Sequence, residues 1–406
     1  APVRARWFFA ATDVPAAEAA LGTGVAGAER IAILSVFDDR WILEAPVDSI
    51  SSVASVYGAL GDLAQDESGT PALVEATALV GIDPDFVAAR DLEGDVASTV
   101  AFLDSGCDTA HDDRGDPDEN DIDGYPDAGD IADWLDATDR LSGELELRIV
   151  GWHDVTDDLP LAVGPWDDHF HGTAMASAGF SGGRIDETLT GVAPEGRMVI
   201  VKTWNFEGRW ERWASDFFLG VEWLIQNAER LRVQACVVGT VWDIDHGFAT
   251  AVDALAEAGI LLVAPVGNAR VSAGWPARVP EAFGVGAATK DGVVAAYSAP
   301  ASSLTLPPVL DVVAPGGSAI VPGGGIVVAD NEPNDTYRPR TGTSIAAALV
   351  GGAVNVIAEI ARESGYPWPQ GRARVSWLSD VLRATALELA AEEPGALADA
   401  RLDRGG

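Results

Sequence analysis

Basic side chains are scarce in this chain of 406 residues, which carries 26 lysines and arginines against 63 aspartates and glutamates. The formal net charge at pH 7 is −37. Nucleic-acid binding needs lysine and arginine to neutralise phosphates, and anionic membrane surfaces attract the same residues. The composition therefore argues against both partners. It leaves two explanations of the acidity: solubility, including solubility in a salty medium, and the binding of divalent cations.

Cysteine is nearly absent as well, since the sequence holds only Cys107 and Cys236. Two cysteines exclude a disulfide framework and a cysteine-rich zinc cluster. Each is expected to behave as a small buried hydrophobic residue, and a single disulfide between them stays open.

Long hydrophobic runs are also missing, because no apolar run reaches the roughly 18–20 residues that a membrane-spanning helix needs. The chain begins at Ala1 and has no positively charged segment followed by an apolar one. Either a signal peptide has been removed or the chain was shortened for expression.

Apolar residues make up 48% of the sequence, which is enough for a globular protein with one large domain and a smaller one. Residues 1–68 are expected to form a small α+β domain, and residues 69–406 the main domain. In the small domain the patterns predict strands at Arg4–Ala11, Arg30–Phe37 and Arg40–Ala45. They predict helices at Val14–Leu21 and Val47–Leu60, and a polar linker at Gln65–Thr70.

In the main domain, short and nearly uninterrupted apolar runs alternate with helical segments. The predicted strands are Thr99–Leu103, Leu147–Gly151, Met198–Lys202, Val233–Val238, Ile260–Pro265 and Ala282–Ala287. The predicted helices are Gly172–Gly179, Ser215–Arg230, Thr250–Ala258 and Ser344–Ala361. Strands without polar alternation are buried on both faces, so the sequence predicts a doubly wound α/β fold, with a mainly parallel sheet and helices on both faces.

An acidic insertion, residues 108–140, interrupts this alternation. Part of it nearly matches a calcium-binding loop, with oxygen ligands at Glu119, Asp121, Asp123, Asp127 and Asp130 and a glycine at position 6 of the loop. Glutamate at the first position and aspartate at the last depart from the pattern, so a solvated acidic loop is the alternative. Zinc does not fit, because the loop has no cluster of cysteine and histidine.

Three short segments place an acid, a histidine and a serine among small residues, in the order Asp104, His171, Ser344. Asp104 ends a predicted buried strand, and active sites of α/β sheets lie at such strand ends. His171 and Ser344 each open a predicted helix. A serine hydroxyl becomes nucleophilic only beside a base that an acid orients, and this order is one of the known layouts of such a triad.

A tetrahedral intermediate also needs donors for its oxyanion. The free N–H groups at the start of the helix at Ser344 offer one donor, and Asn268, which closely follows the strand at Ile260–Pro265, is the candidate for the second. Asp154 also follows a predicted strand and is the rival to Asp104 as orienting acid.

Together these segments resemble the subtilisin-like serine protease family, the subtilases, from about residue 75 to residue 395. The resemblance rests on Val100–Gly106, Gly151 and Trp152 with Asp154, Asp167–Thr173, Gly191–Pro194, Pro265–Asn268, Trp275–Ala277, Val285–Ala287, Tyr297 and Ser298, Asp311–Gly316 and Gly342–Ala346. It favours Asp104 over Asp154 because Asp-Ser-Gly after Val-Ala-Phe-Leu fits the family motif.

The resemblance implies a serine endopeptidase that hydrolyses peptide bonds through an acyl-enzyme. Ser344 would be the nucleophile, His171 the base, Asp104 the orienting acid and Asn268 an oxyanion donor. Residues 1–68 would be an inhibitory pro-segment removed by cleavage near Gly61–Thr70, with a permanent accessory domain as the alternative. A secreted or periplasmic location and bound calcium are further expectations from the family.

The sequence departs from the family where a substrate would bind. Phe170 stands before His171 where the family usually has glycine, and Ala235–Gly239 replaces its Asn-x-Ser-x-Gly edge. The expected substrate contacts are Val237, Val238, Gly239, Ala264, Pro265 and Gly274, with Gly274 as the open floor of a pocket for an apolar side chain. These departures leave two alternatives, a catalytically silent binding module and an enzyme that matures or ligates one dedicated peptide.

Overall fold

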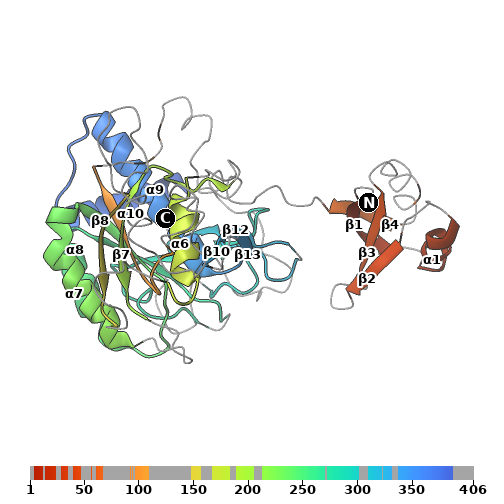
Figure 1. Ribbon diagram of the computed structural model, residues 1–406, viewed down its shortest axis with the longest axis horizontal. Helices are drawn as coiled ribbons and strands as arrows, with labels where there is room; N and C mark the ends of the chain where they lie inside the picture. Colours follow the sequence, from red (N-terminus) through yellow and green to blue (C-terminus); the bar gives the residue numbers. More distant parts are fainter. Residues whose placement is uncertain are drawn as a thin grey trace, which may run out of the picture. The chain divides into compact units, whose positions relative to one another are not determined.

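The chain forms two compact units, Ala1–Thr70 and Pro71–Gly406, in a computed structural model (Figure 1). The structure describes residues 4–11, 14–23, 29–34, 40–46, 56, 61–66, 92, 94, 97–108, 148–156, 167–182, 189–204, 213–269, 272–300, 310–321, 323–331 and 337–386.

The described part of the N-terminal unit is an antiparallel sheet with one helix. Its strands are in the order β2-β3-β1-β4, and the element bounds are β1 Arg4–Ala11, α1 Val14–Thr23, β2 Glu29–Leu34, β3 Arg40–Pro46 and β4 Gly61–Asp66. The helix predicted at Val47–Leu60 lies outside the described residues except for Val56. The linker predicted to start at Gln65 is wrong at its first two residues, because they pair with β1 as the end of β4.

The second unit contains a seven-stranded sheet in the order β11-β10-β9-β8-β5-β7-β6. All neighbouring strands are parallel. The bounds are β5 Thr99–Asp104, β6 Ile149–Asp154, β7 Arg197–Lys202, β8 Val233–Val238, β9 Leu261–Pro265, β10 Phe283–Ala288 and β11 Val312–Pro315. From β5 the chain goes to the edge strand β6 and returns to β7 between them, whereas β8 to β11 follow one another outward on the other side of β5. The carboxyl ends of β5 and β8 therefore meet at the switch point where such sheets place their sites.

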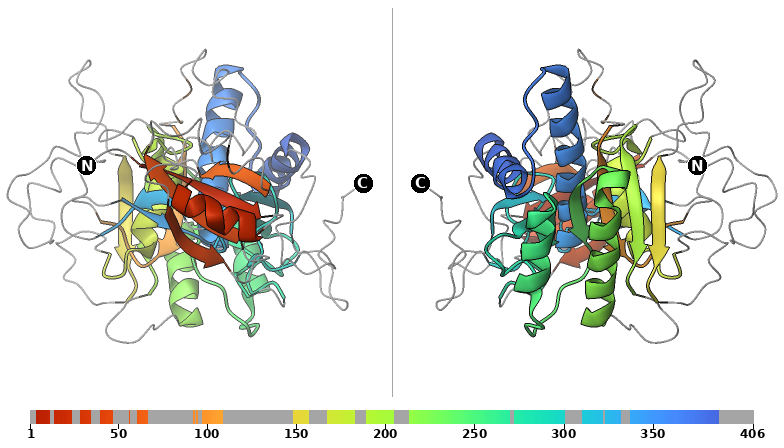
Figure 2. Two further views of the ribbon diagram at one scale, coloured as in Figure 1. Left: turned by 90° about the vertical axis from the view of Figure 1, so that its right-hand side faces the viewer. Right: turned by 90° about the vertical axis from the view of Figure 1, so that its left-hand side faces the viewer.

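Helices cover both faces of this sheet (Figures 1 and 2). Helices α6 and α9 with α10 pack on one face, and α7 and α8 on the other. Along β5, Val100 and Phe102 enter the first core while Ala101 and Leu103 enter the second. The helix bounds are α6 His171–Phe180, α7 Ala214–Leu231, α8 Phe248–Glu257, α9 Thr343–Glu363 and α10 Arg372–Thr385. The predicted doubly wound α/β fold is confirmed.

Helix α9 is the central helix of the first core. Among the described residues it is long and apolar enough to cross a membrane by length and composition, with a mean hydropathy of 1.8. However, 83% of that apolar window is buried inside the protein. Its hydrophobicity is explained by packing against α6 and the sheet.

A two-stranded antiparallel hairpin leads into α9. It consists of β12, Ile326–Ala329, and β13, Tyr337–Arg340. The Ala329 N–H donates to Ser177 Oγ on α6 over 3.0 Å, so the hairpin is fixed to the helix that begins at His171.

Candidate active site

The structure brings together the three residues that the sequence predicted as a triad. His171 Nδ1 lies 2.9 Å from both carboxylate oxygens of Asp104, and His171 Nε2 lies 2.9 Å from Ser344 Oγ. Asp104 is fully buried, whereas 22% of the His171 side chain is exposed. A buried acid therefore contacts one imidazole nitrogen, and the hydroxyl of the buried Ser344 contacts the other.

Two glycines allow these elements to approach. A Cβ atom on Gly172 would lie 2.0 Å from the Gly106 carbonyl oxygen, and one on Gly239 would lie 1.6 Å from Asp104 Oδ2. Any side chain at Gly239 would displace the carboxylate. Gly239, directly after β8, thus packs on the acid of the adjacent β5.

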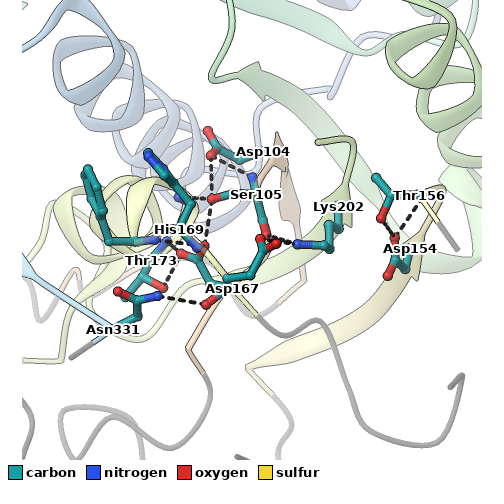
Figure 3. A network of polar contacts seen from close by, with 12 residues as sticks. Asp104, Ser105, Asp154, Thr156, Asp167, His169, Thr173, Lys202 and Asn331 are labelled. Atoms are coloured by element: carbon teal, nitrogen blue, oxygen red, sulfur yellow. Dashed lines mark hydrogen bonds and ion pairs between the residues drawn. The ribbon is translucent and has the colours of Figure 1, made fainter. Parts of the chain in front are cut away.

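A second buried carboxylate, Asp167, holds the start of α6 (Figure 3). Its Oδ1 accepts from the N–H groups of His169 and Phe170, and its Oδ2 accepts from the N–H and hydroxyl of Thr173 at 2.9 and 2.6 Å. Burial alone would raise the pKa of Asp167, but these hydrogen bonds outweigh burial and lower it. Asp167 therefore caps the helix in place of Phe170, which makes no side-chain cap.

Ser105 links the two carboxylates. Its hydroxyl lies 2.7 Å from Asp167 Oδ1 and 3.2 Å from Asp104 Oδ1, and it accepts from the Gly172 N–H. Lys202, also buried, donates to the Ser105 carbonyl oxygen at 2.8 Å and to Asp168 at 2.6 Å (Figure 3). Sequence reasoning missed these supporting residues, although the Asp-Ser-Gly motif and the paired acids before His171 were visible.

The side chain of Asn268 is oriented by Thr343. Its Oδ1 accepts from the Thr343 N–H and hydroxyl, both at 3.0 Å. Because an N–H can only donate, the atom facing it is the amide oxygen, and the Asn268 NH₂ group is turned the other way. The Thr343 hydroxyl accepts in turn from the Gly267 N–H at 3.1 Å.

Gly342 leaves a space between the nucleophile and two donors. A Cβ atom there would lie 3.2 Å from Ser344 Oγ, 3.6 Å from Asn268 Nδ2 and 3.8 Å from the Ser344 nitrogen. The Ser344 N–H belongs to the first turn of α9, where N–H groups have no partner within the helix. A carbonyl oxygen in this space would meet both the exposed amide and the helix N–H.

Asp154 is placed elsewhere. Its Oδ1 accepts from the N–H and hydroxyl of Thr156 at 2.8 and 2.7 Å, at the end of the edge strand β6 (Figure 3). The structure pairs Asp104 with His171, as the sequence analysis preferred.

Of the predicted substrate contacts, Val237, Val238, Ala264 and Pro265 are buried. Alternation along β8 and β9 sends Val237 into the core beneath α9, and Val238 and Ala264 into the opposite core. Their side chains are therefore part of the two cores that flank the sheet. Among the predicted contacts, Gly239 is half-buried at the end of β8.

Gly274, predicted as the open floor of a pocket, is buried beside Val241. A Cβ atom on Gly274 would lie 2.9 Å from the Val241 Cβ, and one on Gly267 would lie 3.6 Å from a Val241 methyl group. Mutual backbone hydrogen bonds between Trp242 and Trp275 hold these segments together. Val241 therefore fills the space over Gly274, next to the segment that ends in Asn268.

The predicted calcium ligands, from Glu119 to Asp130, lie outside the described residues. Within the described ranges, no group of three histidine, cysteine or acidic side chains is arranged to hold a metal ion. Cys107 and Cys236 are both buried thiols without a disulfide between them, and burial raises the pKa of Cys236.

The Subtilase family matches residues 97–404 of the sequence. The chain belongs to the subtilase family. Membership indicates a serine peptidase, and it covers the whole sheet and the residues from Asp104 to Ser344.

Similar subtilases include Subtilisin E of Bacillus subtilis (strain 168), 29% identical over 205 residues, which are 49% of this chain and 48% of that protein. Subtilisin BL of Lederbergia lenta is 29% identical over 192 residues, 47% of this chain and 64% of that protein. The major intracellular serine protease of Bacillus subtilis (strain 168) is 26% identical over 278 residues, which are 65% of this chain and 69% of that protein. The chain thus spans about half the length of the first of these relatives.

Among solved structures, a cold adapted subtilisin-like serine proteinase aligns with a TM-score of 0.49 and 20% identity. The alignment covers 75% of this chain and 85% of that protein.

Proposed function

We propose that the protein is a serine endopeptidase that cleaves peptide bonds through an acyl-enzyme on Ser344. The observation that carries the proposal is the continuous contact from Asp104 through His171 to Ser344, at 2.9 Å on each side of the imidazole. Membership of the subtilase family supports it.

In the proposed reaction, Ser344 Oγ attacks the scissile carbonyl carbon while His171 Nε2 takes the hydroxyl proton. Asp104 accepts from His171 Nδ1–H and stabilises the imidazolium that forms. The oxyanion enters the space beside Gly342 and accepts from the Asn268 amide and the Ser344 N–H, and losing one such donor typically lowers turnover roughly 10²–10³-fold. His171 then protonates the leaving amine, and water repeats the sequence to release the acid.

We further propose that the N-terminal unit is a pro-segment and that self-cleavage follows Asp66. The sequence predicted cleavage near Gly61–Thr70. We propose the part of this range after Asp66, because Gly61–Asp66 is paired with β1 in the N-terminal sheet. A strand held in its own sheet is not free to enter a cleft in the extended form that a protease binds.

The test compares the full-length wild type with Ser344→Ala by intact mass over time, together with labelling by an organofluorophosphate and peptide mapping. We expect self-cleavage after Asp66 and a label on Ser344 in the wild type alone. The buried Ser298, whose hydroxyl oxygen accepts from the Ala287 N–H at 3.1 Å, serves as the internal unlabelled control. A wild type that neither cleaves itself nor takes the label would refute the proposal.

The alternatives predict other outcomes. A silent binding module would leave a peptide library uncut, as Ser344→Ala does. A ligating or maturing enzyme would resolve the acyl-enzyme with an amine, and the product mass would differ from that of hydrolysis. Export remains a prediction, since one relative is named an intracellular protease.

A further inference from the structure

Phe170, directly before His171, has a backbone conformation that phenylalanine rarely adopts. Its φ is +105° and its ψ is −22°, in the left-handed region. Bulky residues persist there only when their surroundings impose it, and such outliers concentrate at functional sites. The other described non-glycine residue with positive φ, Arg232, simply ends helix α7. Phe170 therefore calls for a specific explanation.

The Phe170 ring is held by two side chains. The His169 ring stacks on it with 4.1 Å between centroids. The Arg340 guanidinium carbon lies 3.8 Å from the Phe170 ring centroid, well within cation–π range. Glycine at position 170 would relieve the backbone strain but could make neither contact.

Arg340 connects this ring to the segment that carries the nucleophile. It ends β13, four residues before Ser344. Its Nη2 lies 2.5 Å from Asp330 Oδ2, and Asp330 is buried at the end of β12. Asn331, the next residue, forms a second contact with the segment before His171, because its side-chain amide donates to the Asp167 carbonyl oxygen over 2.8 Å (Figure 3).

We infer that Phe170 and Arg340 form a positioning clamp that aligns His171 with Ser344. The two catalytic side chains belong to different elements, α6 and α9, and proton transfer depends on the 2.9 Å contact between them. The clamp joins Phe170, the residue before α6, to Arg340 in β13, the strand before α9. Its effect on turnover rests on the proposed function.

A variant that affects catalysis more than stability tests the clamp. Phe170→Gly relieves the backbone strain but loses both ring contacts, so its thermal midpoint should stay close to that of the wild type. Loss of alignment should lower kcat roughly 10–100-fold with KM nearly unchanged, as small misplacements do. Phe170→Tyr keeps the ring and should restore kcat. A stable Phe170→Gly with unchanged kcat would overturn the inference.

A double-mutant cycle tests the pairing. Arg340→Met should lower kcat about as much as Phe170→Gly, and the double variant should lose little more, because either change breaks the same clamp. The matched control is Arg338→Met, which removes the neighbouring arginine from Asp330 and leaves Arg340 against Phe170. Independent losses that multiply in the double variant, or an equal loss in the control, would contradict the clamp.

NMR of the His171 imidazole separates this inference from the proposed function, because it requires no turnover. The His171 ring signals should shift in Phe170→Gly and Arg340→Met but stay in place in Arg338→Met. If the wild type is as inactive as Ser344→Ala, the proposed function fails while the NMR result still decides the clamp. Unchanged His171 signals in both clamp variants would refute it.

Discussion

The missing side chain at Gly342 keeps open the space between Ser344 Oγ and the Asn268 amide. Its φ of 165° is ordinary extended backbone, so the glycine is needed for room rather than for conformation. We expect Gly342→Ala to fold normally, since the new methyl group meets no backbone closer than the Ser344 nitrogen at 3.8 Å. The same methyl group would exclude the oxyanion, so kcat/KM should fall at least about 10²-fold.

Peptide hydrolysis and thermal unfolding of Gly342→Ala check this expectation, with the exposed neighbour Thr341→Ala as the control. Normal activity in Gly342→Ala would show that the oxyanion does not bind in the space beside residue 342. A large loss in thermal midpoint would show instead that the glycine is needed for packing.

Asp167 is the buried charge on which the start of α6 depends. In Asp167→Asn, an amide NH₂ would face backbone N–H or hydroxyl donors, which should lower the free energy of unfolding by about 3 kcal/mol at neutral pH. Because the pKa of Asp167 is lowered in the folded state, the unfolded state binds more protons than the folded state when the pH falls below the ordinary aspartate pKa of about 3.9. The stabilisation is therefore present above that value and is lost as the pH falls through the folded pKa.

Denaturant unfolding between pH 3 and pH 8 measures this difference. The gap between wild type and Asp167→Asn should be widest above about pH 5 and should narrow in acid. Asp380→Asn, whose side chain is 78% exposed, should leave stability unchanged at every pH. A gap that is constant with pH would mean that Asp167 does not act as a carboxylate.

The segment after β8 lies beside the proposed oxyanion donor Asn268. Val241 lies over Gly274 and beside Gly267, so it would limit the side chain that a substrate, bound as the proposed reaction requires, could place there. We expect Val241→Gly to raise kcat/KM for peptides with phenylalanine before the scissile bond, relative to alanine, by about tenfold. Ile244→Gly, in the same segment but 66% exposed, is the control. An unchanged ratio in Val241→Gly would place the acyl-side pocket elsewhere.

The elements that the sequence predicted best are those whose signal is local. Buried parallel strands such as β5 appear as apolar runs, and the residues of the triad stand in small-residue motifs. The hairpin β12–β13 and helix α10 were missed. In β13, the sequence Tyr-Arg-Pro-Arg carries no apolar pattern. The burial of every residue in β8 and β9 was harder to predict, because it depends on helices that cover both faces of the sheet.

The role of Asp167 was equally invisible, because its partners are mostly backbone N–H groups and hydroxyls. The Arg340–Phe170 contact joins residues 170 positions apart, and no local pattern connects them. Long-range polar and aromatic contacts of this kind can be identified only once the fold is known.

The whole molecule carries many more acids than bases, 63 against 26, so its folded state is opposed by charge repulsion. Added salt screens that repulsion over a Debye length of about 10 Å at 0.1 M. We therefore expect the thermal midpoint to rise as NaCl increases from 20 mM to 1 M. A specific calcium site would add stability beyond screening, because an ion bound only by the folded state shifts the folding equilibrium.

Thermal unfolding in CaCl₂ and NaCl at equal ionic strength separates the two effects. If the insertion at residues 108–140 binds calcium as the sequence predicts, CaCl₂ should raise the midpoint of the wild type further than NaCl does. The double variant Asp121→Asn and Asp123→Asn should lose only that calcium-specific increase and keep the response to NaCl, because it removes ligands and few of the 63 acids. An equal calcium effect in wild type and variant would contradict the predicted calcium site at these residues.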